Sequence, residues 1–176
     1  MRVIAGSRRG TTLHAPRGQD TRPTGDRVRE AVFSILGPVV GLSVLDLFGG
    51  SGALAIEALS RGAASATLVD SSPAAIAAIR RNLQATRLEA EVHEAGALAF
   101  LQRARRRPRQ YDLVFLDPPY RQASVLGARL AAALAPVLAP DASVVAESDR
   151  RQPLQLDLPL LDERRYGDTL IRIHGP

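Results

Sequence analysis

The sequence predicts an α/β protein in which a mostly parallel β-sheet is covered by helices on both faces. From residue 43 onward, short apolar stretches typical of strands alternate with longer stretches of helical periodicity, and the links between them are short. This alternation favours parallel strands joined by right-handed crossovers. Two last apolar stretches, at 158–166 and 169–174, meet at Gly167-Asp168, a pair of turn residues that predicts an antiparallel hairpin at the end of the sheet.

Composition narrows the class of protein further. The 176 residues suffice for one domain, and the absence of cysteine excludes a disulfide framework and a thiolate metal site. The three histidines, His14, His93 and His174, lack the spacing of metal ligands, so no metal is expected. No apolar run approaches the length that spans a membrane, and no signal-peptide core follows Met1. We therefore expect a cytoplasmic protein with no membrane partner.

The positive charge of the chain is concentrated at its N-terminus. The net charge is +5, and every basic residue is arginine. Residues 1–30 carry seven arginines against three acidic residues, whereas the remaining residues carry sixteen against fifteen. A local excess of this kind favours contact with a polyanion such as a nucleic acid.

The first 25 residues are predicted to form a small basic appendage to a domain that occupies 26–176. Strand-like runs at 2–5 and 11–14 flank a glycine-bounded tip and predict a short β-hairpin. Arg8 and Arg9 lie at this tip, where they could grip RNA phosphates. A frayed, solvated terminus is the alternative interpretation.

A helix is expected to begin at Asp26, which would cap it, and to run to about Leu36, where Gly37-Pro38 ends it. Its apolar positions fall on one face. Four residues cluster at its entrance and could hold a phosphate or a carboxylate, or could simply be solvated: Arg22, Thr24, Arg27 and Arg29.

The elements of the sheet follow in order. Strands are expected at 43–48, 66–70, 90–94, 112–116 and 142–147, and helices at 52–61, 73–86, 96–106 and 122–137. The arginine-rich run at 103–109 lies at the C-terminal end of a helix, where cations complement the helix dipole. We therefore interpret this run as a solvated helix end and not as a nucleic-acid patch.

Three aspartates lie at, or within two residues of, the carboxyl ends of predicted strands. Asp46 ends the first strand and precedes the glycine-rich turn Gly49-Gly50-Ser51-Gly52, whose glycines permit positive φ and close approach of a ligand. Asp70 ends the next strand, at the spacing that places a carboxylate over a nucleoside ribose. Asp117 ends the fourth. These acids are expected to converge on one crevice where the strand order reverses.

The fourth of these strands continues into Asp117-Pro118-Pro119-Tyr120. Two successive prolines lack N–H donors and have fixed φ, so their carbonyls are held in one geometry. The Asp117 carboxylate and the Pro118 carbonyl would accept the protons of an exocyclic amine, and Tyr120 would stack on its ring. Such a pair of acceptors beside an aromatic face suits a flat heterocycle.

The glycine-rich turn also satisfies the dinucleotide fingerprint, which keeps an NAD(P) oxidoreductase among the alternatives. Asp46, just ahead of the glycines, is poorly placed beside a pyrophosphate but well placed for an ammonium group. No pair of residues suited to hydride transfer follows. A cationic cofactor that carries adenosine and an amino-acid tail fits better, and we expect S-adenosyl-L-methionine.

Several motifs, taken in chain order, resemble the class I amino-methyltransferases. They are Asp46-Leu47-Phe48-Gly49-Gly50-Ser51-Gly52, the acidic Asp70, and Asp117-Pro118-Pro119-Tyr120. Further stretches resemble the RsmD family of 16S rRNA guanine-N2 methyltransferases: Arg2-Val3-Ile4-Ala5-Gly6, Arg22-Pro23-Thr24-Gly25-Asp26-Arg27-Val28-Arg29-Glu30, Gly52-Ala53-Leu54 and Glu57-Ala58-Leu59-Ser60-Arg61-Gly62. The resemblance covers nearly the whole chain. It departs from the family at Gly25, where threonine is common, and at Gly49, where alanine is usual.

This resemblance implies a Rossmann-like class I methyltransferase fold with a seven-stranded sheet that ends in a reversed hairpin. It implies methylation of the exocyclic N2 amine of one particular guanine in 16S rRNA. The implied catalytic residues are Asp117, Pro118 and Tyr120. The implied cofactor-binding residues are Thr24, Asp46, Phe48, Gly50, Ser51, Gly52, Asp70, Ser71, Ala97 and Asp117. The expected RNA contacts are Arg8, Arg9, Arg22 and Arg27. Gly96-Ala97 offers no polar side chain to the adenine, so only the Ala97 backbone N–H could hold it.

The expected substrate is 16S rRNA within an assembling small ribosomal subunit, and the protein is expected to be a monomer. The chain has no room for a separate DNA-recognition domain, and a basic finger grips phosphates without reading many bases. The alternatives are a DNA adenine or cytosine methylase, a protein glutamine methylase and a non-catalytic rRNA-binding assembly factor. The glutamine enzymes usually carry asparagine where this chain has Asp117.

Overall fold

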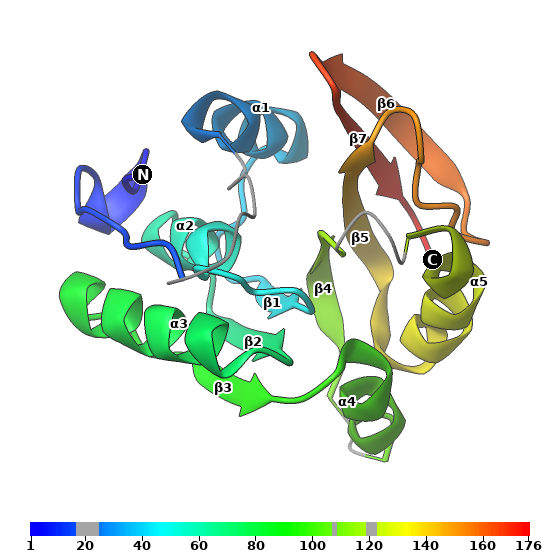
Figure 1. Cartoon of the computed structure of the whole chain (residues 1–176), viewed down its shortest axis with the longest axis horizontal. Helices are drawn as coiled ribbons and strands as arrows, with labels where there is room; N and C mark the ends of the chain where they lie inside the picture. The colour runs from blue at the N-terminus through cyan, green and yellow to red at the C-terminus, as the bar shows by residue number, and fades with distance from the viewer. Residues whose placement is uncertain (17–24, 107–108, 119–122) are drawn as a thin grey trace.

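A computed structural model of the chain describes residues 1–16, 25–106, 109–118 and 123–176 (Figure 1). Seven strands form one sheet in the order β3-β2-β1-β4-β5-β7-β6. The strands are β1 (Ser43–Asp46), β2 (Ser65–Asp70), β3 (Glu91–Glu94), β4 (Tyr111–Leu116), β5 (Leu138–Asp149), β6 (Leu160–Tyr166) and β7 (Thr169–His174). The helices are α1 (Asp26–Leu36), α2 (Ala53–Ser60), α3 (Pro73–Thr86), α4 (Ala97–Ala104) and α5 (Ala123–Leu134).

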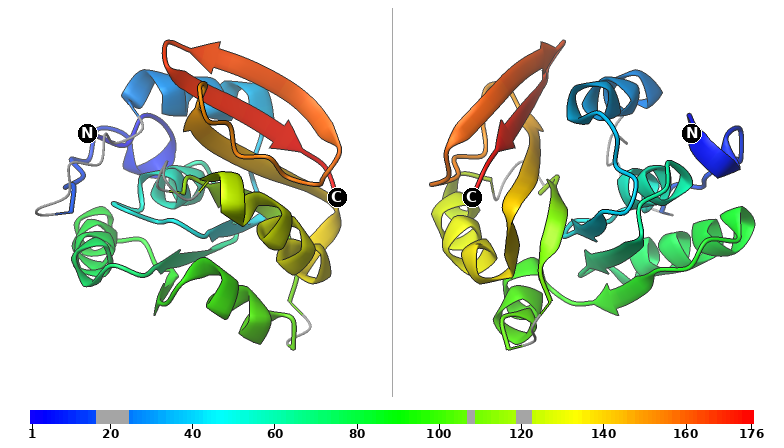
Figure 2. Two further views of the ribbon diagram at one scale, coloured as in Figure 1. Left: turned by 45° about the vertical axis from the view of Figure 1, so that its right-hand side comes forward. Right: turned by 180° about the vertical axis from the view of Figure 1, so that it is seen from behind.

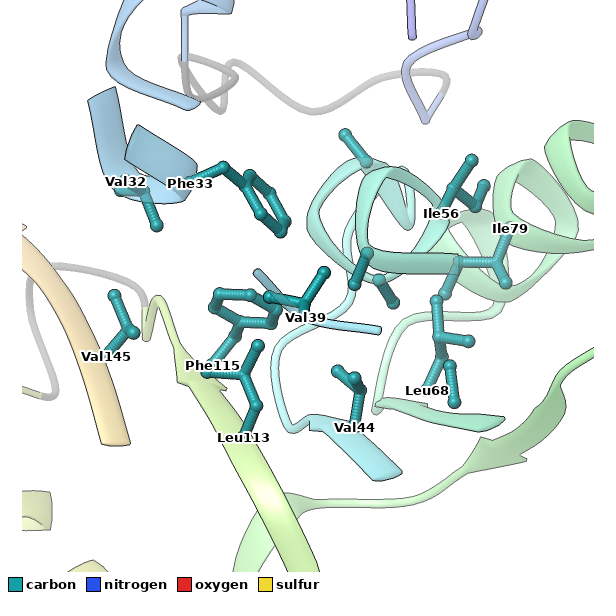
Figure 3. Packing of buried hydrophobic residues seen from close by; sticks show 14 of the residues in the cluster. Val32, Phe33, Val39, Val44, Ile56, Leu68, Ile79, Leu113, Phe115 and Val145 are labelled. Atoms are coloured by element: carbon teal, nitrogen blue, oxygen red, sulfur yellow. The ribbon is translucent and has the colours of Figure 1, made fainter. Parts of the chain in front are cut away.

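The helices cover both faces of the sheet, as predicted, and each face has its own apolar core. Helices α1, α2 and α3 lie over one face, and α4 and α5 lie over the other (Figures 1 and 2). Phe33 of α1 meets Phe115 of β4 on the first face, with ring centroids 5.9 Å apart (Figure 3). Leu101 of α4 and Leu130 of α5 are fully buried on the second face. Alternate residues of the buried central strands point into these two cores.

The strand directions also agree with the prediction. Strands β1 to β5 pair in parallel, and β7 pairs antiparallel with both β5 and β6. The chain moves outward from β1 through β2 to β3 and then returns to the other side of β1 to form β4. The carboxyl ends of β1 and β4 therefore flank the point where the strand order reverses, which is where ligands bind in open α/β sheets.

Some boundaries differ from those expected. Strand β5 extends from Leu138 to Asp149, and a 3₁₀ turn at Ala135–Val137 separates it from a shortened α5. The prediction that Asp26 caps α1 is wrong, because Gly25 occupies the cap position and Asp26 is the first helical residue. The Asp26 carboxylate instead contacts Arg29 at 3.1 Å within the first turn. No helix of the described chain is long and apolar enough to cross a membrane.

The predicted antiparallel pairing of the N-terminal segment is confirmed, but the two predicted strands are wrong. Val3 donates to the Thr11 carbonyl at 2.9 Å, but the strand pairing within residues 1–16 is limited to an isolated antiparallel bridge between Arg2 and Thr12. The tip is a 3₁₀ turn at Gly6–Arg8. A ladder does not continue because the next N–H groups, those of Ile4 and Ala5, donate to the carboxylate of Glu57 on α2.

This segment docks firmly on the domain. Val3 and Leu13 are buried in the core beneath α1 to α3, and the segment lies against α2 and α3 (Figures 1 and 2). Ile4 and Ala5 donate to the two oxygens of Glu57 at 2.8 and 2.9 Å. The division into an appendage at 1–25 and a domain at 26–176 stays a prediction.

The buried Arg29 has a structural role that differs from the predicted ligand contact. Its side chain is fully buried, lies 3.8 Å from Glu57 and donates to the backbone carbonyl of Arg2. Arg61 donates to the same Glu57 carboxylate at 2.7 Å and stacks over the Phe33 ring at 4.7 Å. Glu57 therefore ties α1, α2 and the N-terminal segment together with compensated charge.

Candidate functional site

The three predicted acids do meet at the carboxyl edge of the sheet. Asp46 pairs in register with Leu68 on β2 and Phe115 on β4, so Asp70 and Asp117 each follow two residues beyond its level. The charge of Asp70 is close enough to act on the Asp46 carboxyl, and the charge of Asp46 is close enough to act on that of Asp117. The predicted convergence of the strand ends is confirmed.

Asp46 is almost completely buried below the glycine-rich turn. Burial, with a smaller contribution from the charge of Asp70, raises the pKa of its carboxyl from 3.8 to about 7. Hydrogen bonds from the backbone N–H groups of Phe48 and Ala55 act in the opposite direction. Ala55 lies in the first turn of α2, where N–H groups lack helical partners and favour an anion. A cation brought to this carboxyl would be strongly favoured.

Asp70 holds the glycine-rich turn in place. One carboxylate oxygen accepts from the Gly50 N–H at 2.9 Å, and the other accepts from the Ser72 N–H at 2.8 Å. Each oxygen has a second lone pair, so the half-buried carboxylate can still accept from the two hydroxyls of a ribose. Gly50 has φ of 53°, and an added Cβ would meet only the Phe48 carbonyl at 3.9 Å. The backbone is therefore open to a ligand at this point, and these residues fit a nucleoside cofactor.

Asp117 follows β4 directly, and the next residue, Pro118, is buried. Burial, the charge of Glu147 and the charge of Asp46 raise the pKa of the Asp117 carboxyl well above its usual value. A carboxyl in such a site gains most from a partner that brings either positive charge or N–H donors. Asp117 and Asp46 therefore lie near each other at the carboxyl edge of the sheet, which is the arrangement that the predicted catalytic role requires.

Glu147 is a fourth acid at this edge, and it was missed in the sequence interpretation. It lies on β5, is only 7% exposed and neighbours Asp117, since Leu116 pairs with Ala146 just before them. The signal was present, because the predicted strand 142–147 ends in this glutamate just as the other strands end in aspartates.

Asn82 of α3 was also missed, and it connects the N-terminal segment to the glycine-rich turn. Its side chain accepts from the His14 N–H at 2.8 Å and donates to the carbonyls of His14 at 2.9 Å and Ser51 at 2.8 Å. A single buried amide thus satisfies three backbone groups of two distant segments. Sequence alone gave no signal for it, because an asparagine within a helix is ordinarily solvated.

The remaining predicted cofactor residues are placed as follows. Phe48 is half-buried beside the turn, Ser51 is half-buried, and Ser71 is exposed just after Asp70. Ala97 is the first residue of α4, and no side chain caps that helix at Gly96. Its N–H is thus available to an acceptor on a ligand. Thr24 and Tyr120 lie outside the described residues, so their roles stay predictions.

The predicted RNA-contacting arginines differ in exposure. Arg9 and Arg27 are exposed, Arg8 is half-buried, and Arg22 lies outside the described residues. The Arg8 backbone N–H donates to the Ser60 hydroxyl at 3.0 Å, so this turn is held against the end of α2. Their contact with RNA stays a prediction.

One other candidate site carries less chemistry. A surface pocket lined by Glu91, His93, Phe100, Arg103, Ala104, Arg109 and Tyr111 lies away from the carboxyl edge. Arg109 forms an ion pair there with Glu91 of β3 and stacks on Tyr111 of β4, so its contacts are those of a structural residue. Within the described residues, no three His, Cys, Asp or Glu side chains gather in a way that could hold a metal ion.

Residues 1–175 match the family described as Conserved hypothetical protein 95. YlbH of Bacillus subtilis, whose name assigns it provisionally to the rRNA methyltransferases, is 38% identical over 99% of this chain and 98% of its own length. The ribosomal RNA small subunit methyltransferase D of Escherichia coli K12 is 42% identical over 69% of this chain, a match that spans 61% of the E. coli protein.

The fold is also found among solved structures. The hypothetical protein TTHA0928 of Thermus thermophilus superimposes with a TM-score of 0.85 at 29% identity, over 100% of this chain and 99% of that one. The similarity therefore extends over the entire fold and includes the N-terminal segment as well as the sheet.

Proposed function

The chain belongs to the family described as Conserved hypothetical protein 95, the RsmD family of methyltransferases, and from this premise we propose that it methylates the exocyclic N2 amine of a guanine in 16S rRNA. The observation that carries the proposal is the meeting of Asp46, Asp70 and Asp117 at the reversal of strand order. The names of the relatives support rRNA of the small subunit as the substrate.

The cofactor is S-adenosyl-L-methionine, which supplies an electrophilic methyl group on a positively charged sulfur. Asp46 would hold the ammonium group of its amino-acid part, and Asp70 would accept from the ribose hydroxyls. The Ala97 N–H would face the adenine. Phe48, Gly50, Ser51, Gly52, Ser71 and Thr24 complete the proposed binding surface.

Asp117 and the Pro118 carbonyl act on the amine. A guanine N2 amine is a weak nucleophile because its lone pair is delocalised into the ring. Two acceptors that take its two protons turn this lone pair toward the methyl group, and they stabilise the positive charge that develops on nitrogen. After transfer, the positively charged nitrogen gives up one N–H proton to the Asp117 carboxylate or to water. Tyr120 would stack on the base, which must be unpaired or extruded from its helix.

The raised pKa values of Asp46 and Asp117 couple cofactor binding to this chemistry. A cation placed among these carboxyls lowers the pKa of both, because an opposite charge favours the ionised form. Asp117 then becomes the full acceptor that the amine needs. Asp46 that holds the cofactor's ammonium group would in this way leave Asp117 better prepared for the base, although the charge of Glu147 still acts on it.

The arginines in and just after the N-terminal segment would position the RNA. Arg8 and Arg9 lie on a turn fixed to α2, and Arg27 and Arg22 lie at or before the start of α1. Contacts to phosphates orient a nucleic acid without reading its sequence. Such a surface suits folded rRNA in an assembling small subunit, with the enzyme acting as a monomer.

Methyl transfer from labelled S-adenosylmethionine tests the proposal. The acceptors are small ribosomal subunits, bare 16S rRNA, duplex DNA and translation release factors, each incubated separately with the protein. We expect label in 16S rRNA, whether the RNA is supplied in the small subunit, as bare RNA, or in both forms. Label only in DNA or only in the release factor would refute the proposed substrate.

A further inference from the structure

Glu147 occupies the position beside Asp117 at the carboxyl edge of the sheet. Strands β4 and β5 are parallel neighbours, and Leu116 pairs with Ala146 immediately before the two acids. Val145, two residues earlier on β5, points into the core beneath α1 to α3 together with Phe115 of β4 (Figure 3). Residues two apart on a strand share a face, so Glu147 lies on this face at the end of the core.

Glutamate is seldom buried to the degree seen at this position. Glu147 is 7% exposed, and the residue opposite it on the neighbouring strand β7 is the apolar Ile171. Its charge acts on Asp117 more strongly than that of Asp46 does. Two adjacent buried carboxyls repel when both are ionised, and N–H donors placed between them relieve that repulsion. The arrangement therefore favours a ligand edge that presents two neighbouring donors.

Only one standard nucleobase presents such an edge beside an amine. The Watson–Crick edge of guanine carries the N1–H and the N2 amine side by side, and both are donors. Adenine and cytosine each pair their amine with a ring nitrogen that is an acceptor. That acceptor would face a carboxylate with no hydrogen between them, which costs binding energy because the buried group is left unsatisfied.

We propose that Glu147 is a specificity-determining residue, which accepts a hydrogen bond from the N1–H of the target guanine while Asp117 accepts from its N2 amine. The inference rests on the proposed function and deepens it, because it assigns the choice of guanine to one side chain. Extruded bases are commonly read along this same edge.

The test combines a change in the protein with a change in the base. Small subunits are reconstituted with 16S rRNA in which the methylated guanosine is kept or is replaced by 2-aminopurine riboside. This analogue keeps the N2 amine but has an acceptor at N1. The value of kcat/KM is measured on both substrates for the wild type, for Glu147→Gln and for the control Glu163→Gln, an acid of the β6 edge strand.

We expect the wild type and Glu163→Gln to prefer guanine by about 100-fold. The glutamine amide can donate to the acceptor at N1. Its oxygen can still accept from the guanine N1–H, but without the negative charge of the carboxylate. Glu147→Gln should therefore gain activity on 2-aminopurine without gaining any on guanine, which lowers the preference at least about tenfold. The proposal would be overturned if Glu147→Gln lost the same factor of activity on both substrates, so that its preference for guanine was unchanged.

Two further measurements keep the result interpretable. Binding of S-adenosylhomocysteine to Glu147→Gln should match the wild type, because β4 separates Glu147 on β5 from Asp46 on β1 and Asp70 on β2. If Glu147→Gln does not fold, Glu147→Asp takes its place, and this variant should keep the preference for guanine. A Glu147→Asp protein that folds and binds S-adenosylhomocysteine but has lost the preference would overturn the inference. A wild type that leaves guanine N2 unmethylated refutes the proposed function itself, which separates the two failures.

Discussion

Asp46→Asn should abolish a proton release that accompanies cofactor binding. The pKa of Asp46 is about 7 in the buried site of the free protein, so at pH 6 the Asp46 carboxyl carries a proton in about nine-tenths of the molecules. An ammonium group held against the carboxyl returns its pKa toward the ordinary value or below. Binding at pH 6 should therefore release about 0.9 proton from Asp46, and affinity should weaken about 50-fold between pH 7 and pH 5.

Titration calorimetry with S-adenosylhomocysteine, in two buffers of different ionisation enthalpy, counts these protons. Asp46→Asn should lower the count by about 0.9, and Asp141→Asn, which removes an exposed acid near the start of β5, should leave it at the wild-type value. Any remaining release in Asp46→Asn is assigned to Asp117, whose pKa is also raised. An unchanged proton count in Asp46→Asn, or affinity that falls as pH rises, would refute the reasoning.

Three other substitutions give separate tests. Asp117→Ala should abolish methyl transfer while S-adenosylhomocysteine still binds, and undiminished turnover would contradict the assigned role. Glu57→Gln should lower the free energy of unfolding by about 3 kcal/mol, since the fully buried Arg29 loses the buried one of its two countercharges and keeps only the half-buried Asp26. Chemical denaturation measures this, and a change below about 1 kcal/mol would be inconsistent with that role. Gly6→Ala should release the N-terminal segment to faster proteolysis, because its Cβ would lie 1.8 Å from a carbonyl oxygen at the end of α2. Gly10→Ala has similar φ and open space, so equal cleavage of both variants would contradict the docking argument.

The sheet and the acidic residues at its carboxyl edge could be predicted because short stretches of sequence determine both. Apolar runs of strand length end in Asp46, Asp70 and Asp117, and parallel strands bring their carboxyl ends to one edge. Glu147 obeyed the same rule and was overlooked because the motif at Asp117 already explained the crevice. The rule, applied to each strand in turn, finds Glu147 as well as the three aspartates, and it also finds Glu94 at the end of β3.

The contacts of the N-terminal segment could not be predicted, because they join residues that lie far apart in the sequence. Glu57 lies in an apolar helix and reads as a solvated charge until the fold brings Ile4 and Arg29 to it. A carboxylate that accepts two backbone N–H groups replaces the expected strand ladder. Propensity describes each segment alone and cannot anticipate which donors a tertiary partner will take.

Nucleoside analysis of methylated RNA tests the central claim most directly. Small subunits are incubated with the protein and methyl-labelled S-adenosylmethionine, and their rRNA is digested and examined by mass spectrometry. Label should be found in N2-methylguanosine with the wild type, and none should be found there with Asp117→Ala. Label in a different nucleoside, or equal label in the two proteins, would contradict the account of an amine held at the end of β4.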